Sequence, residues 1–159
     1  MRRREKGFSL IELLIVVTII LVIAAIAIPN LMRSRMSANE ASAIASMRTV
    51  LTSEIVYSAT YTVGFAPDLL SLSDGGTPSN CIPPALPSAS SACLLDSSVA
   101  SGNKSGYVFA YAPASGGGFK LNADPLVPGG SGQRHFYTDD TSVLRVNITT
   151  AASASDPPL

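Results

Sequence analysis

The distribution of apolar residues along the chain changes sharply at one point, near residue 29. Phe8 to Ile28 is a run of 21 residues in which Glu12 is the only charged side chain. As a helix this run would be roughly 31 Å long, which is enough to cross the hydrocarbon core of a bilayer. Pro29 interrupts the run. The pattern therefore predicts a membrane-spanning helix over 8–28, and it places one carboxylate where a charge is costly.

A second apolar pattern, with helical spacing, follows the first. Four apolar residues three or four positions apart predict one stripe on an amphipathic helix over 29–60. The stripe consists of Ile44, Met47, Leu51 and Ile55. The charged residues expected away from it are Glu40, Arg48 and Glu54. We expect this helix to lay its stripe on the core of a domain, and Gly64 and Pro67 to end it.

The C-terminal part of the chain has the alternating pattern of half-buried strands. Four such segments within 107–150 predict an antiparallel meander, and they are 107–112, 119–124, 134–138 and 143–149. The segment 113–118 is rich in glycine and is expected to be a hairpin turn. Residues 151–159 are small or polar and contain proline, so we expect a frayed tail. A long helix packed on this sheet belongs to the α+β class.

The region 61–106 has the composition of a connecting loop. A short helical turn is expected over 68–72, and from Ser73 onward the chain is dominated by Ser, Pro, Gly, Ala and Asn. Loops of this length inside a compact domain are usually functional or mobile.

The net charge of zero hides an uneven distribution. Residues 1–7 hold four of the eleven basic side chains and one of the eleven acidic ones, which leaves seven basic against ten acidic in the rest. Without a later basic patch, the charge gives no support for nucleic-acid binding. The basic start is typical of a cytoplasmic anchor for an inserted helix, so the part after the span would lie outside the cytoplasm.

The only two cysteines, Cys81 and Cys93, both lie in the connecting loop. A bond between them would close a loop of about 13 residues and contribute up to roughly 3 kcal/mol. Because disulfides persist outside the cytoplasm, we expect this bond to form. A metal site is not expected here, since the sole histidine, His135, is far away in the sequence.

Two ordinary interpretations of the N-terminus leave Glu12 unexplained. A secretory signal peptide would fit the basic start, and Ala25-Ile26-Ala27 has the small-x-small form of a cleavage site. The apolar run is longer than the usual ~7–15 residues of such a peptide, however. A plain signal anchor fits the length and the positive-inside bias. Neither accounts for a carboxylate near the start of the run.

A third interpretation rests on a family resemblance. The segment Lys6-Gly7-Phe8-Ser9-Leu10-Ile11-Glu12-Leu13-Leu14 resembles the processing signature of type IV pilins and of the pseudopilins of type II secretion. The short basic leader (residues 1–7), Gly7, Phe8 and Glu12 all occur at the expected spacing, and so do the apolar helix and Pro29. The resemblance implies that a prepilin peptidase cuts after Gly7 on the cytoplasmic side and methylates the new amino group of Phe8.

The physical chemistry of the segment agrees with the resemblance. Cleavage would create a cationic amine at Phe8, one helical turn from Glu12. In an array of parallel helices, Glu12 of one copy can neutralise the amine of its neighbour, and such a pair sets the register between copies more than it adds stability. Pro29 removes one backbone donor and is expected to kink or loosen the helix.

No other constellation in the sequence indicates chemistry. His135 lies on a predicted strand without a nucleophile or base at a recognisable spacing, so we expect neither an enzyme nor a cofactor. Some secretion pseudopilins bind calcium near the C-terminus, and Asp124, Asp139 and Asp140 could supply oxygen ligands. Ordinary turn residues explain these aspartates equally well.

The resemblance implies a structural role. We expect a prepilin that is held in the inner membrane with its N-terminus in the cytoplasm and is then polymerised into a helical filament in the periplasm or outside the cell. Its partners would be copies of itself, the prepilin peptidase, an inner-membrane assembly platform with its ATPase-driven machinery, and minor pilins or pseudopilins. The alternatives are a type II secretion pseudopilin and, in another class, a monomeric signal-anchored periplasmic binding protein.

Overall fold

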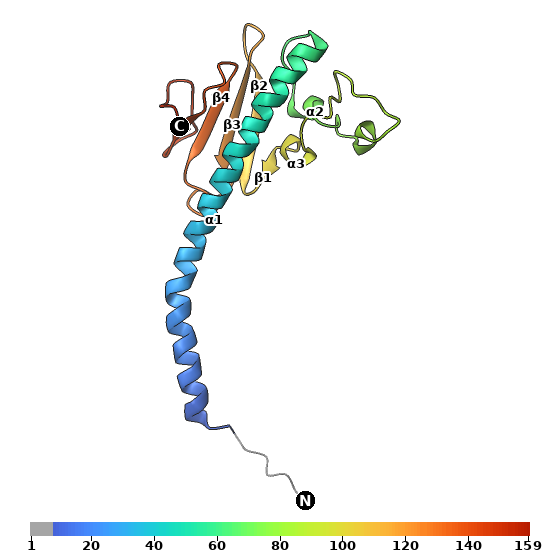
Figure 1. Ribbon diagram of the computed structural model, residues 1–159. Helices are drawn as coiled ribbons and strands as arrows, with labels where there is room; N and C mark the ends of the chain where they lie inside the picture. The colour runs from blue at the N-terminus through green and yellow to red at the C-terminus, as the bar shows by residue number, and fades with distance from the viewer. Residues whose placement is uncertain (1–7) are drawn as a thin grey trace, which may run out of the picture. The chain divides into compact units, whose positions relative to one another are not determined.

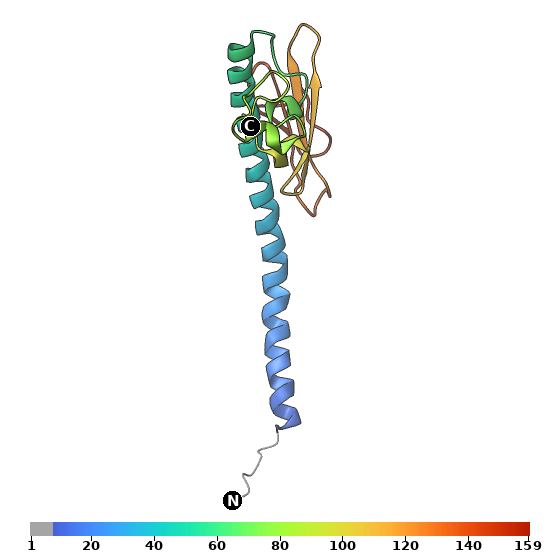
Figure 2. The same ribbon diagram turned by 90° about the vertical axis from the view of Figure 1, so that its right-hand side faces the viewer.

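A computed structural model describes residues 8–159 of the chain (Figures 1 and 2). The longest element is the helix α1, Leu10–Tyr61, which has 52 residues. The chain divides into two compact units, one ending at Arg35 and the other beginning at Met36, and α1 contributes to both. In the second unit, α1 is followed by short helical turns and then by a β-sheet.

The sheet is an antiparallel meander, in which each strand pairs with the next one in the sequence. Among residues 8–159 its strands are β1 (Asn103–Lys104), β2 (Tyr107–Pro113), β3 (Phe119–Pro125), β4 (His135–Asp139) and β5 (Arg145–Asn147). The α+β class is confirmed, but the expected number of four strands was one too low. The additional strand, β1, has only two residues, which is too short to show an alternating pattern.

The hairpin between β2 and β3 depends on glycine. The amide of Ala114 donates to the carbonyl oxygen of Gly118 at 2.8 Å and closes the turn. Gly116 and Gly117 have φ values of +92° and +85°, a region that residues with a side chain rarely adopt. The turn predicted over 113–118 is therefore confirmed. It sets the register of the longest strand pair, in which Tyr107 lies opposite Pro125 and Pro113 opposite Phe119.

The second part of α1 shares one hydrophobic core with the sheet and the connecting loop. Figure 1 shows this part of the helix lying along the sheet. The buried residues of α1 are Glu40, Ala43, Ser46, Met47, Val50, Leu51, Ser53, Glu54 and Tyr57. Met47 and Leu51 of the predicted stripe are buried and Ile44 is partly buried, as expected.

The predicted positions of Ile55, Glu40 and Glu54 were wrong. Ile55 is 58% exposed, whereas both glutamates are buried. Helix geometry explains the difference, because each residue advances by about 100° around the axis. Counted from Met47, position 54 lies about 20° away and position 55 about 80° away. The face toward the core therefore includes Glu54 and leaves Ile55 at its edge.

Short helical segments interrupt the connecting loop. They are α2 (Leu69–Leu72), the 3₁₀ turn η1 (Pro78–Cys81) and α3 (Ser97–Ala100). The carboxylate of Asp68 caps α2 by accepting hydrogen bonds from the amide and hydroxyl of Ser71, at 2.7 and 2.8 Å. The helical turn predicted over 68–72 is confirmed, and α3 with β1 gives structure to a stretch that was expected to be loop.

The C-terminal segment 151–159 is bound to the sheet, so the expected fraying was wrong. The amide of Val146 donates to the carbonyl oxygen of Pro157, and the amide of Leu159 donates to that of Leu144. The side chain of Asn122 donates to the carbonyl oxygen of Ala152 at 2.8 Å, and Ala152 is buried. Composition misses this contact because two of the partners are backbone groups at and beside the edge strand β5, which need hydrogen bonds whatever the side chains are.

Candidate functional site

The start of α1 places Phe8 and Glu12 within one helical turn of each other. Phe8 precedes the helix and is 69% exposed. The amide of Leu13 donates to the carbonyl oxygen of Ser9 at 3.2 Å, so helical hydrogen bonding already begins at Ser9. Glu12 lies in the first turn, where the helix dipole favours a negative charge. Gly7, the other residue of the predicted cleavage site, lies outside the described residues.

The first part of α1 presents apolar side chains on every side. Large apolar residues are exposed all along it, and so is Phe8 before it: Leu10, Ile11, Leu13, Leu14, Ile15, Val16, Val17, Ile19, Ile20, Leu21, Val22, Ile23, Ile26, Ile28, Leu31 and Met32. In the described part of the chain, α1 is the one helix long and apolar enough to cross a membrane. A helix that is apolar all round requires either lipid or neighbouring helices around it.

The few polar side chains of this segment are satisfied within the helix itself. The hydroxyl of Thr18 donates to backbone carbonyl oxygens one turn earlier, at 3.0 Å for Leu14 and 2.8 Å for Ile15. The side chain of Asn30 donates to the carbonyl oxygen of Ile26 at 3.1 Å. Pro29 lies inside α1, which continues on both sides of it. Within residues 8–159, Glu12 makes no ion pair, so it is the one costly group of the segment.

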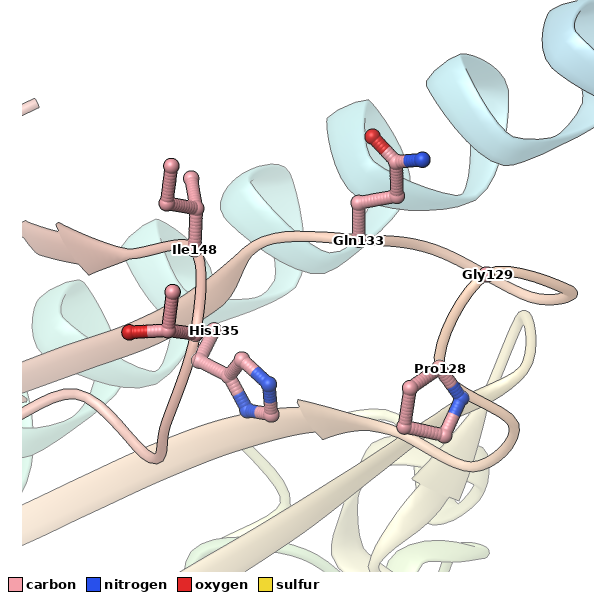
Figure 3. Close-up of a pocket in the computed structure, with 6 residues that line it drawn as sticks. Pro128, Gly129, Gln133, His135 and Ile148 are labelled. Atoms are coloured by element: carbon pink, nitrogen blue, oxygen red, sulfur yellow. The ribbon is translucent and has the colours of Figure 1, made fainter.

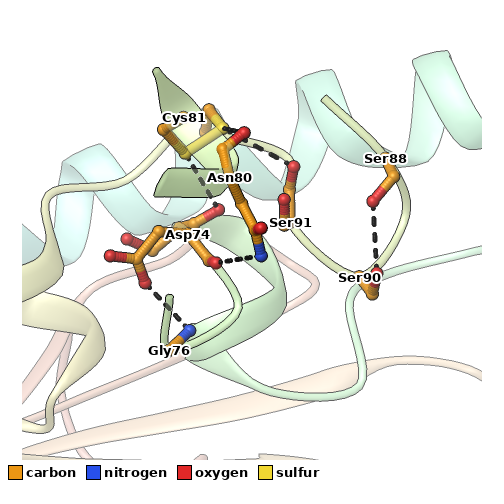
Figure 4. The surroundings of a disulfide bond; sticks show 9 residues. Asp74, Gly76, Asn80, Cys81, Ser88, Ser90 and Ser91 are labelled. Carbon is orange, nitrogen blue, oxygen red and sulfur yellow. Dashed lines mark hydrogen bonds between the residues drawn. A yellow bond between two sulfur atoms is a disulfide. The ribbon is translucent and has the colours of Figure 1, made fainter. Parts of the chain in front are cut away.

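The two cysteines of the connecting loop form a disulfide (Figure 4). The Cα atoms of Cys81 and Cys93 are 5.6 Å apart. Close by, the side chain of Asn80 donates to the carbonyl oxygen of Asp74 at 3.0 Å, and the amide of Gly76 donates to the Asp74 carboxylate at 2.9 Å. The bond and these contacts hold the base of a loop whose tip, Leu86, is 85% exposed.

His135 lies on β4 and is paired with Asp124, with 2.6 Å between Nδ1 and Oδ1. It borders a surface hollow of about 550 Å³, together with residues of the β3–β4 loop and of the segment after β5. Figure 3 shows the side chains of Gln133 and Ile148 pointing away from the imidazole. The polar groups around this hollow do not converge on one point, as they do in a binding site.

The aspartates considered as calcium ligands are engaged separately. Asp124 contacts His135, and the carboxylate of Asp139 accepts from the amide of Thr141 at 3.0 Å. Across residues 8–159, no group of three or more His, Cys, Asp or Glu side chains is arranged to hold a metal ion.

Two buried carboxyl groups connect α1 to the rest of the second unit, and both were expected to lie away from the core. Glu40 accepts from the amides of Gln133 and Arg134, at 2.8 and 3.2 Å, and from Nε of Arg134 at 2.8 Å. Glu54 contacts Ala66 and Tyr111. The partners of Glu40 lie more than 90 positions away in the sequence, so no local spacing could have indicated the pair.

Comparisons with known proteins agree with the geometry of α1. Residues 2–28 match the family described as the prokaryotic N-terminal methylation motif. The chain is 36% identical over 124 residues to the type IV wide pilus major component PilA4 of Thermus thermophilus, and the match covers 76% of this chain and 90% of that protein. No solved structure matches the chain.

An apolar anchor helix with a glutamate in its first turn, continuing into an α+β unit, defines a structural subunit of the pilin type. The chain belongs to the type IV pilin family. It is accordingly a structural subunit and not an enzyme. Its apolar helix fits anchoring in the inner membrane before assembly into a filament.

Proposed function

We propose that this chain is a prepilin that is cleaved after Gly7, methylated on the new amino group of Phe8 and polymerised into a type IV pilus-like filament. The observation that carries the proposal is the start of α1, where an exposed apolar surface contains a single carboxylate, Glu12. Such a surface is stable in lipid before assembly and among other helices after it.

Cleavage would supply a positive charge to pair with the carboxylate of Glu12. The new amine at Phe8 carries a positive charge and lies within one turn of Glu12 in the same copy. In a bundle of staggered helices, the amine of one copy can also meet the carboxylate of the next. A buried ion pair adds little net stability, but an arrangement that leaves one of its charges without a partner is strongly destabilised. The pair therefore selects one stagger over the others.

Apolar contact would hold the filament together, and the charge pair would align it. Each copy leaving the membrane keeps its apolar side chains away from water by packing them against those of its neighbours. The second unit would then form the outer surface. The relative from Thermus thermophilus is a major pilus component, which favours a major subunit here as well.

This role requires partner proteins of defined kinds. They are a prepilin peptidase that acts at the cytoplasmic face of the inner membrane, an assembly platform with its ATPase-driven machinery, and minor pilins. A pseudopilin of type II secretion would use the same N-terminal chemistry. The presence of surface filaments, or the loss of enzyme export when the chain is deleted, distinguishes the two.

The mature N-terminus tests the proposal directly. Intact-mass and peptide mass spectrometry of the protein purified from cells should find a chain that begins at Phe8 and carries one added methyl group on its amine. A Gly7→Ala variant keeps the helix unchanged and is the matched control in which the uncut leader should accumulate. A mature chain that begins at Ile28 would identify a signal peptide and contradict the proposal.

A further inference from the structure

Glu54 is a carboxyl group buried in the core. It lies on the second part of α1 and is 0% exposed. Its Oε2 atom accepts a hydrogen bond from the amide of Ala66 at 2.9 Å. Its Oε1 atom lies 2.6 Å from the hydroxyl oxygen of Tyr111 on β2. The same hydroxyl oxygen lies 2.6 Å from the carbonyl oxygen of Ala66.

The number of hydrogens needed for the contacts of Tyr111 shows whether Glu54 is charged. The hydroxyl of Tyr111 has one hydrogen, yet it is at hydrogen-bond distance from two oxygen atoms. The carbonyl oxygen of Ala66 can only accept, so the Tyr111 hydrogen is needed there. The contact between Tyr111 and Glu54 then requires a second hydrogen, which a neutral carboxylic acid supplies. If Glu54 were ionised, one of the two contacts would have no hydrogen, and two oxygen atoms would face each other with their lone pairs at 2.6 Å.

The surroundings of Glu54 favour the neutral form. The ionisable groups near it are Tyr57 on its own helix and Tyr111 on β2, and the charge that acts on both tyrosines from before α2 is the anion of Asp68, so none of these groups is a cation. Burial raises the pKa of the Glu54 carboxyl above its ordinary value, against the opposing effect of the hydrogen bonds from Tyr111 and Ala66. Burial and the neighbouring Glu54 also raise the pKa of Tyr111, which keeps its hydroxyl protonated.

We propose that Glu54 is held as a neutral acid and closes a pH-sensitive latch on the segment that leaves α1. In the latch, Glu54 donates to Tyr111, Tyr111 donates to the carbonyl of Ala66, and the amide of Ala66 donates back to Glu54. The ring joins α1, the segment 62–66 and β2. When Glu54 loses its proton, one hydrogen bond of the ring is lost and a charge remains in an apolar core.

The direction of the pH effect follows from the raised pKa. A carboxyl whose pKa is higher in the folded state than its ordinary 4.5 stabilises the fold most at pH values below 4.5. Its contribution is lost as the pH rises through the folded-state pKa. The latch is therefore closed in acid and weakens toward alkaline pH, which is the reverse of an ion-paired glutamate.

Glu54→Gln is the matched variant, because the amide has the shape of the neutral acid and can donate to Tyr111 but cannot ionise. We would measure thermal unfolding of the full chain in detergent micelles from about pH 4 to about pH 9, for the wild type, Glu54→Gln and Glu40→Gln. We expect the Tm of Glu54→Gln to match the wild type in acid and to exceed it increasingly toward alkaline pH. Glu40→Gln should show its deficit at neutral pH and lose it in acid.

Parallel pH profiles for the wild type and Glu54→Gln would overturn the proposal. A second measurement on the wild type keeps the test valid even if the variant fails to fold. Side-chain carbon NMR of the full chain labelled at glutamate Cδ should show a carboxyl signal that remains protonated when that of Glu40 has ionised, and this signal should be missing from Glu54→Asp. A Glu54 signal that titrates together with that of Glu40 would refute the latch.

Discussion

Glu40 and Glu54 are carboxyl groups of one helix that have different hydrogen-bond partners. Both are buried, but Glu40 faces the guanidinium of Arg134, whereas Glu54 faces a phenol and a backbone amide. Burial alone would raise the pKa of Glu40, but the amides of Gln133 and Arg134 and the charge of Arg134 together hold it below its ordinary value. Two glutamates 14 positions apart therefore respond to pH in opposite directions.

Glu40→Gln should destabilise the second unit at neutral pH by about 1–2 kcal/mol, since Arg134 would lose its charged partner. A lowered pKa means that the contribution of Glu40 is present above the ordinary value of 4.5 and is lost as the pH falls through the folded-state pKa. Urea unfolding of the wild type and the variant at pH 7 and in acid measures the difference.

The exposed Asp140→Asn is the control, because it removes one negative charge without removing a buried contact. It should change the free energy of unfolding by no more than about 0.5 kcal/mol. If Glu40→Gln lowers the free energy of unfolding equally at neutral and acid pH, the ion pair with Arg134 contributes nothing beyond packing.

Among the elements, the connecting loop between α1 and the sheet gains its order from three separate devices. The helix caps of Asp68 and Asp96 fix the short helices, and the bond between Cys81 and Cys93 fixes the loop between them. Tyr57 of α1 adds a hydrogen bond to the carbonyl oxygen of Ala89, at 2.7 Å, which attaches the crosslinked loop to the core.

Breaking the disulfide should lower the stability of the second unit by up to about 3 kcal/mol, because the unfolded chain would regain the freedom of a 13-residue loop. The double variant Cys81→Ser with Cys93→Ser, compared with the wild type by urea unfolding, measures this loss. Thiol labelling of the folded wild type should find no reactive cysteine until a reductant is added. Labelling without reductant would contradict the bond.

The elements differ in how far the sequence could predict them. The first part of α1 can be predicted from composition alone, because it packs on no folded core and all of its side chains require the same apolar surroundings. The hairpin turn at 113–118 follows from its glycines. The helical repeat counted from Met47 already places position 54 toward the core and position 55 at its edge. The partner that makes a buried carboxyl acceptable at position 54 could not be assigned, because Tyr111 is 57 positions away. The bound tail 151–159 was missed for a different reason, since two of its partners are backbone groups at and beside β5, whose hydrogen bonds do not depend on side-chain type.

At the scale of the whole molecule, the glutamate of the first turn is the residue on which assembly should depend. Glu12→Ala should leave membrane insertion and cleavage intact, because the substitution makes the helix more apolar and leaves the residues on both sides of the Gly7–Phe8 bond unchanged. We expect filaments to be lost, since the Phe8 amine would then have no partner. Electron microscopy of cells, with immunoblotting for the processed chain, measures both outcomes.

Thr18→Val is the matched control for this experiment. It changes one polar residue of the same helix, but the Thr18 hydroxyl bonds only within its own helix, so filaments should persist. Normal filaments in Glu12→Ala would remove the role of the charge pair. If the wild type forms no surface filaments and deletion of the chain blocks export of secreted enzymes, the protein is a pseudopilin of type II secretion.

The crosslinked loop has a practical consequence for anyone who wishes to decorate such a polymer. Among residues 8–159, Leu86 is the most exposed large apolar side chain, and the disulfide fixes both ends of the loop that carries it. The chain end at Leu159, by contrast, is hydrogen-bonded to Leu144 and would be displaced by a fusion. An epitope inserted beside Leu86 would be displayed once per subunit, at the repeat distance of the filament, while the terminus stays in place.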